Sequence, residues 1–308
     1  MIYTVLNHYN FYMKLIYIIL FTIFTTSVYA DWRNQIVGKS LDEISKKSSK
    51  FVSGLIPGEG VTEVEINYAE NLDNNFQFKV LGVRDIIPNE NSNLFTQFSL
   101  QNQEINNDDR IIGNLGFGYR NLSADQSVMK GVNVFYDQDL TENHKRVGFG
   151  LEAKASYLDF SYNRYYKATN QILINAVNEE VLSGSEFNVA SKLPYMAWTT
   201  FNARRYLWES DNAANDIRGM VYSLEMALTP SLNIDILKDD PRGKRPGDHT
   251  VKLTFVHPPR NTKVSMIDGF LSTEAFVKQN MQEALKDKVR RNNNLAIEIQ
   301  GSVVVTRQ

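Results

Sequence analysis

The sequence contains no cysteine among its 308 residues, which excludes disulfide bridges, thiolate metal sites and thiol nucleophiles together. Proline is scarce, at 8 residues, and the formal net charge of −2 provides no basic surface for a nucleic-acid partner. Aromatic residues, in contrast, are plentiful, with 15 tyrosines and 17 phenylalanines. This composition favours a strand-rich protein, either a soluble β-protein or a membrane barrel with aromatic girdles.

The clearest pattern lies in residues 130–165, which we interpret as three consecutive β-strands. Apolar and polar side chains alternate there with a period of two over about ten residues in each segment. One face of the first two strands is apolar: Val132, Val134, Tyr136, Val147, Phe149, Leu151, Ala153 and Ala155. The opposite face carries charged residues such as Asp137 and Glu152, which a soluble sandwich would have to bury in its core. A membrane barrel accommodates both faces, with lipid outside and a polar lumen inside.

Spaced residues in the same stretch also resemble a known family. They are Asn133, Phe135, Asp137 and Asp139, followed by Arg146, Gly148, Gly150 and Glu152. Their arrangement resembles the signature of the inverse autotransporter β-domain, the outer-membrane translocator of intimin and invasin adhesins. The alternative from this stretch alone is a soluble antiparallel meander.

The resemblance implies an all-β fold, a transmembrane antiparallel β-barrel of about 12 strands in the bacterial outer membrane. It implies outer-membrane lipid, the barrel-assembly machinery and periplasmic chaperones as partners. Because the sequence shows no catalytic constellation and no dinucleotide fingerprint, we expect no enzymatic activity and no cofactor. Whether the chain forms a homodimer stays open, and a host or surface receptor is expected only where a passenger domain exists.

The N-terminus, residues 1–30, is interpreted as a secretory signal peptide, of which residues 1–12 read as a misplaced start. Met13 and Lys14 open a basic region, residues 15–24 form an apolar run, and Val28 and Ala30 are small residues at the cleavage site. The apolar run is shorter than the roughly 20 residues that a transmembrane helix needs. The mature chain is therefore expected to begin at Asp31.

Residues 31–60 are interpreted as a short periplasmic helical segment. Ser40 and Glu43 form a capping box, apolar residues follow at helical spacing up to Leu55, and Pro57-Gly58 ends the pattern. This segment is too short to be a domain. The larger peptidoglycan-binding module of some members of the resembled family has no room here.

Residues 61–260 are predicted to form the barrel. Alternation indicates twelve strands, an even number as such barrels require: 62–70, 74–84, 93–103, 110–121, 128–139, 145–155, 157–166, 186–193, 196–207, 217–228, 231–238 and 249–257. In 217–228, Met220, Tyr222 and Leu224 share one face. Tight turns alternate with longer polar connections such as 167–185, which places the short turns on the periplasmic side and the long loops outside.

Residues 261–308 are predicted to be a linker. Residues 273–291 read as an amphipathic helix, and residues 295–306 as an extended segment that runs outward. Between them, Arg290, Arg291, Asn292, Asn293 and Asn294 strongly resemble the linker of the inverse autotransporters. In that family the linker lies in the lumen and leads to the cell surface. The competing interpretation is a surface helix followed by an edge strand.

The sequence after the linker is short. Fourteen extended residues from Leu295 reach about 46 Å at most, enough to cross a membrane but not to present a folded binding domain. We expect export without an immunoglobulin-like adhesin passenger in this chain.

Three functions of different classes remain possible from the sequence. The first is a translocator whose lumen carries both signs of charge, contributed by Glu63, Lys79, Arg120, Glu152, Lys154 and Glu225. The second is an outer-membrane channel or porin with a periplasmic tail. The third and least favoured is a barrel enzyme, because there is no G-x-S-x-G elbow.

No metal site is expected either. Asp137, Asp139 and Glu142 lack the spacing of a calcium loop, and the histidines lack the spacing of metal ligands.

Overall fold

The computed structural model describes residues 50, 58–69, 76–106, 108–211, 215–243, 247–299 and 302–305. The predicted signal peptide and almost all of the predicted N-terminal helix lie outside these residues. Within the described ranges, no helix is long and apolar enough to cross a membrane.

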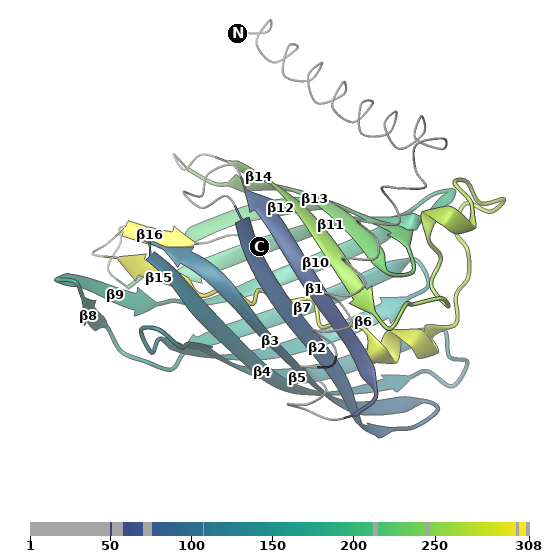
Figure 1. Cartoon of the computed structure of the whole chain (residues 1–308), viewed down its shortest axis with the longest axis horizontal. Coiled ribbons are helices and arrows are strands. Elements are labelled where there is room, and N and C mark those ends of the chain that lie inside the picture. The colour runs from purple at the N-terminus through teal and green to yellow at the C-terminus, as the bar shows by residue number, and fades with distance from the viewer. Residues whose placement is uncertain are drawn as a thin grey trace, which may run out of the picture. The chain divides into compact units, whose positions relative to one another are not determined.

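Twelve strands close into a barrel in which every hydrogen-bonded neighbour is antiparallel (Figure 1). The strands are β1 (Gly60–Ala69), β2 (Phe76–Pro88), β3 (Ser92–Ile105), β4 (Asp108–Leu122), β5 (Val128–Asp139), β6 (Lys145–Ala155), β7 (Leu158–Lys167), β10 (Ser183–Leu193), β11 (Met196–Glu209), β12 (Ile217–Thr229), β13 (Leu232–Pro241) and β14 (Asp248–His257). The order is sequential, and β14 pairs with β1 to close the ring. The predicted barrel of twelve strands is confirmed, with strand ends that differ by a few residues.

The two faces of the wall are those that the alternation predicts. Val132 and Leu151 point outward and are 52% and 58% exposed, whereas Asp137 and Glu152 point inward and are 0% and 6% exposed. On β12, Tyr222 is exposed while Val221 and Ser223 are buried. The apolar surface of this barrel is therefore on its outside.

A second, four-stranded sheet was not predicted. Its order is β16 (Ser302–Val305), β15 (Ala296–Ile299), β9 (Val177–Val181) and β8 (Ile172–Ile174) (Figure 1). The hairpin β8–β9 lies within the connection that was expected to be a polar loop. Its two-residue turn, Asn175-Ala176, has φ angles of 49° and 65°. Both values match a type I′ hairpin turn, but alanine is an unfavourable residue there, so the sequence gives only a weak signal.

The α-helix predicted for residues 273–291 is wrong. The described residues of this range contain one short 3-10 helix, η3 (Met281–Lys286), and otherwise irregular backbone. Side chains of the barrel bind the backbone here: Ser156 Oγ, in the turn between β6 and β7, accepts from Gln279 N at 3.0 Å, and Arg120 Nη1 on β4 donates to Leu285 O at 3.0 Å. These bonds replace the internal hydrogen bonds that an α-helix would form.

The described residues of the range 295–306 do not form the single extended segment that was predicted. β15 is extended, but β16 is antiparallel to it, so the chain runs back after Ile299. β15 lies between β9 and β16, and both edges of its backbone are thereby hydrogen-bonded outside the barrel wall.

Candidate functional site

The lumen of the barrel is occupied by residues 287–295, which we call the lumen segment. It follows η3, lies beside the short turns where it begins, and leads into β15 among the long loops (Figure 1). Val289 is 4% exposed, Asn293 is 3% exposed and Leu295 is 0% exposed. A polar chain buried to this degree requires partners along its whole length.

The wall supplies charged partners of both signs. The charged residues that the sequence assigned to the lumen all point inward: Glu63, Lys79, Arg120, Glu152, Lys154 and Glu225. Lysine and arginine of the lumen segment meet acidic wall residues, and its aspartate meets basic residues. The segment and the wall are therefore electrostatically complementary.

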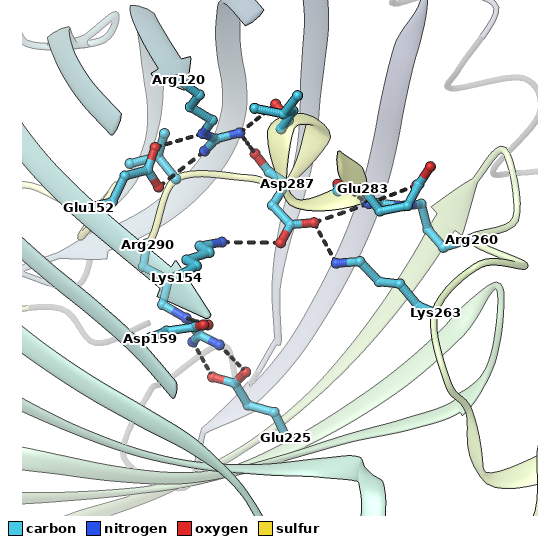
Figure 2. Close-up of polar contacts among 12 residues, drawn as sticks. Arg120, Glu152, Lys154, Asp159, Glu225, Arg260, Lys263, Glu283, Asp287 and Arg290 are labelled. Atoms are coloured by element: carbon cyan, nitrogen blue, oxygen red, sulfur yellow. Dashed lines mark hydrogen bonds and ion pairs between the residues drawn. The ribbon is translucent and has the colours of Figure 1, made fainter. Parts of the chain in front are cut away.

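Asp287 is the acidic residue of the lumen segment (Figure 2). Its carboxylate is 3.2 Å from Lys154 Nζ and 3.1 Å from Arg260 Nη2, and it also pairs with Lys263. Arg120, held by Glu152 at 2.7 Å, donates to the Asp287 carbonyl oxygen at 2.5 Å. The start of the lumen segment is thus fixed through both its side chain and its backbone.

Two basic residues follow. Lys288 Nζ lies 2.6 Å from Glu63 and 2.9 Å from Glu65 on β1. Arg290 binds Glu225 on β12 through two parallel contacts of 2.5 and 2.7 Å (Figure 2). A bidentate arginine–carboxylate pair fixes orientation as well as charge.

Asp137 is the centre of the outer half of the lumen. It accepts from Arg291 at 2.6 Å, from Arg146 at 2.9 Å and from Asn114 at 2.7 Å, and it is 0% exposed. The Arg291 guanidinium also lies over the Phe135 ring, 4.1 Å from its centroid. Phe135 therefore places an aromatic surface on the polar face of β5, where it stabilises a cation.

Neutral amide side chains of the wall bind the backbone of the lumen segment and the side chain of Asn294. On β3, Gln97 accepts from Val289 N at 2.7 Å and Gln101 donates to Asn294 Oδ1. Gln103 accepts from Leu295 N at 2.9 Å and donates to Leu295 O at 2.7 Å. An amide side chain that binds both backbone groups of one residue substitutes for a neighbouring strand.

Gln103→Leu removes both of these hydrogen bonds while keeping the approximate volume. Leu295 N–H and C=O would then lie buried without partners, at roughly 1–3 kcal/mol for each group. We expect faster hydrogen exchange at Leu295 and a lower urea midpoint in detergent micelles. Gln138→Leu, at an outward-facing position of β5, is the matched control. Equal exchange rates in both variants would contradict the role of Gln103.

The lumen segment does not fill the barrel. A cavity of about 320 Å³ lies between this segment and the wall that includes β11 to β14. It is lined by polar and charged groups, among them the Lys252–Asp235 pair at 2.8 Å. A polar cavity of this size holds water.

The residues of the predicted signature all lie on the inward face of β5 and β6. Arg146 donates to the Asn292 carbonyl at 2.8 Å, and Asp137 binds Arg291 as described above. A Cβ atom at Gly150 would lie 2.3 Å from the Asn133 amide oxygen and 2.7 Å from that of Asn163. A Cβ at Gly148 would meet the Tyr165 ring at 3.1 Å. The glycines therefore leave room for side chains that surround the lumen segment.

The sequence interpretation missed a polar cluster at the outer mouth. Arg110 binds Glu179 on β9 through contacts of 2.6 and 2.7 Å, and it lies 3.4 Å from Asp139. His144 Nε2 is 3.3 Å from Glu179, and burial lowers the pKa of this imidazole below its ordinary value. This cluster could not be recognised without the β8–β9 hairpin. The role of Gln97, Gln101 and Gln103 on β3 could have been recognised from the sequence, since these glutamines share one face of the strand.

Candidate metal ligands do not gather within the described ranges, where no group of three or more His, Asp or Glu side chains is arranged to hold a metal ion. The acidic residues considered for calcium have other partners instead. Asp137 binds arginines, and Asp139 accepts from the backbone N–H groups of Thr141 and Glu142 at 2.9 and 3.1 Å.

A closed antiparallel barrel with an apolar exterior and a polar, occupied lumen is an outer-membrane β-barrel, here of the translocator class. The chain belongs to the inverse autotransporters: the family model "Inverse autotransporter, beta-domain" matches residues 23–293. The protein is therefore located in the bacterial outer membrane, in contact with its lipid. The proteins that it resembles include an invasin and an inverse autotransporter adhesin.

Individual relatives agree with this assignment. A putative attaching and effacing protein homolog of Escherichia coli strain K12 is 31% identical over 140 residues, 44% of this chain and 43% of that protein. Invasin of Yersinia enterocolitica is 33% identical over 138 residues, 44% of this chain and 16% of that protein. The matched region thus spans less than half the length of either relative.

One solved structure has a similar fold. It was reported under "Unveiling the Mechanism Behind the in-meso Crystallization of Membrane Proteins" and is 19% identical with a TM-score of 0.61. The match covers 78% of this chain and 99% of that one. At this identity the likeness concerns the fold alone.

Proposed function

We propose that this protein anchors itself in the outer membrane and exports its own C-terminal segment through the barrel to the cell surface. Residues 1–30 are then the signal peptide, 31–60 the periplasmic segment, 61–260 the barrel and 261–308 the exported linker. The observation that carries the proposal is the course of residues 287–299, which run through a closed barrel and join the sheet that the long connection between β7 and β10 contributes to.

The lumen segment forms hydrogen bonds through its backbone and ion pairs through its side chains. The first kind of contact suits a chain that is passing through the barrel, and the second suits a chain that has come to rest. Asn114 donates to Asn293 O at 3.1 Å and Asn163 donates to Arg290 O at 2.8 Å. Such bonds to backbone carbonyls require no particular side chain, so they can form with any extended sequence that passes.

The ion pairs of the lumen segment, in contrast, require its own residues. Asp287, Lys288, Arg290 and Arg291 each have wall partners of opposite charge at defined positions. A passing segment without these charges would leave the wall groups unpaired, which is costly where water is excluded. The ion pairs therefore define where the chain comes to rest.

Epitope accessibility and conductance test the proposal together. A tag after Gln308 should be reached by antibody on intact cells, because the exported end lies outside. Deleting 273–308 should leave a folded barrel with raised ion conductance in planar bilayers, since the occupant of the lumen is gone.

A tag inserted in the periplasmic turn at Gln126 is the matched control and should be reached only after permeabilisation. The proposal fails if the Gln308 tag also needs permeabilisation and the deletion leaves conductance unchanged. That result would favour a channel with a periplasmic tail.

We further infer that periplasmic chaperones and the barrel-assembly machinery deliver this chain to the membrane. Its outward face exposes large apolar side chains such as Phe149 and Leu151, 52% and 58% exposed, on neighbouring positions of β6. A surface of this kind aggregates in water unless it is covered. Depleting the machinery should move the protein from the outer-membrane fraction to periplasmic aggregates; unchanged fractionation would refute this inference.

A further inference from the structure

The chemistry of the lumen changes abruptly where the linker leaves it. From Arg290 to Asn294 the linker is polar, whereas Leu295, Ala296 and Ile297 are apolar and 0% exposed, and Ile299 is 8% exposed. Leu295 directly precedes β15, and the other residues belong to that strand. Glu298 is the polar exception in this stretch: it is 1% exposed, and its carboxylate accepts from Ser210 Oγ at 3.0 Å. The change coincides with the mouth of the barrel that carries the long loops.

Apolar side chains from three parts of the chain meet at this point. Leu295, Ile297 and Ile299 pack with Ile105, Ile112 and Val181. Ala296 packs in a second cluster with Tyr165, Leu182, Tyr206, Trp208, Val221 and Leu237. We call Leu295–Ile299, together with Val181 and Leu182, the outer cap.

The β8–β9 hairpin holds the outer cap in place. Ile297 pairs with Val181 in the antiparallel ladder of β15 and β9, and Leu182 N donates to Ala296 O at 2.8 Å. The hairpin is itself attached to the wall, because Glu179 on β9 forms the bidentate pair with Arg110 on β4. β15, where the linker leaves the lumen, therefore pairs with the free edge of β9.

Below the outer cap the lumen contains open space. The cavity of about 320 Å³ is lined at one end by residues of the periplasmic turns, including Tyr157 and Pro230. Along the linker its lining ends at Asn293, and from the wall it includes Val221 and Leu237, which belong to the apolar cluster of the cap. No residue from Leu295 to Ile299 lines it.

We infer that the outer cap is the permeability seal of this barrel and that the β8–β9 hairpin is the element that closes it over the exported chain. The inference rests on the proposed function, since the seal needs the linker in the lumen. Water and ions pass a charged, hydrated lumen readily, whereas a constriction of close-packed, mainly apolar side chains whose few buried polar groups are hydrogen-bonded to one another excludes them. The polar lumen positions the linker, and the cap prevents leakage.

Cysteine labelling tests the seal without disturbing it, because the natural chain has no cysteine. Thr200→Cys places a thiol in the cavity, and Leu173→Cys places one on the outer surface of β8, where leucine is 68% exposed. A small membrane-impermeant maleimide should label the Leu173 variant on intact cells and leave the Thr200 variant unlabelled. After permeabilisation of the outer membrane, both should be labelled. Labelling of the Thr200 variant from outside, at the rate of the Leu173 variant, would overturn the inference.

A second test disrupts the outer cap by substitution and measures ion conductance. Ile297→Asn should convert a closed protein into one with measurable single-channel conductance, while Leu173→Asn on the same sheet should behave like the natural protein. Heat-modifiable mobility in gels establishes that each barrel is folded. The inference is wrong if the natural protein already conducts like the Ile297→Asn variant.

The tag after Gln308 separates this inference from the proposed function. Protection of the Thr200 thiol from outside, together with an inaccessible tag, would refute exposure of the C-terminal end at the cell surface, while a linker held in the lumen could still form the seal. An accessible tag together with a freely labelled Thr200 thiol would refute the seal alone.

Discussion

Asp137→Ala is expected to lower the free energy of unfolding by about 3–5 kcal/mol, the cost of leaving buried charges without their partner. Asp137 is fully buried between the guanidinium groups of Arg146 and Arg291, at 2.8 and 2.6 Å. Removing the carboxylate leaves two cations facing each other in the lumen. Both the linker and the wall lose stability, because one of these arginines belongs to each.

Urea unfolding of the purified protein in phospholipid vesicles measures this effect. Asp240→Ala, at an exposed position of β13, is the matched control and should change stability by less than about 0.5 kcal/mol. Asp137→Asn should fall between the two, since it keeps an acceptor but not the charge. A cost of Asp137→Ala no larger than that of the control would show that the arginines find other partners.

Leu224→Arg has the second largest expected effect, roughly 2–4 kcal/mol of destabilisation. Leu224 shares the outward face of β12 with Tyr222, which is 37% exposed, and it lies near the middle of the strand. An arginine there must enter the hydrocarbon of the bilayer. Ser223→Arg points into the polar cavity instead, where its guanidinium can stay hydrated.

The pair of variants is informative because the substituted residues are neighbours. Folding equilibria in lipid vesicles should give a much smaller cost for Ser223→Arg than for Leu224→Arg. Equal losses of stability would mean that both faces of β12 are in the same solvent. The membrane assignment requires that they are in different ones.

The barrel itself could be predicted because its signal is local. Val132, Val134 and Tyr136 alternate with Asn133, Phe135 and Asp137, and this period of two is enough to define a strand, its two faces and the solvent on each side. Twelve such segments with alternating short and long connections imply closure. The inward position of the signature residues follows from the same alternation.

The partners of those inward residues could not be predicted in the same way. Gln103 binds Leu295, which is 192 residues away, and Arg146 binds Asn292, which is 146 residues away. Composition favoured a helix in residues 273–291, because a local pattern contains no information on wall groups that compete for the backbone. Ser156 and Arg120 supply that competition.

The sequence by itself therefore determined a membrane barrel, its orientation of faces and the presence of a polar linker after it. Only the tertiary structure decided the conformation of that linker, the β8–β9 hairpin that receives it and the apolar cap at the mouth. The physical reason is the range of the interactions. Strand alternation reflects the apolar lipid on one side of the wall and the polar lumen on the other, which each strand residue meets locally. In contrast, β15 is stable only where β9 offers its edge and where Ile105 and Ile112 offer an apolar surface.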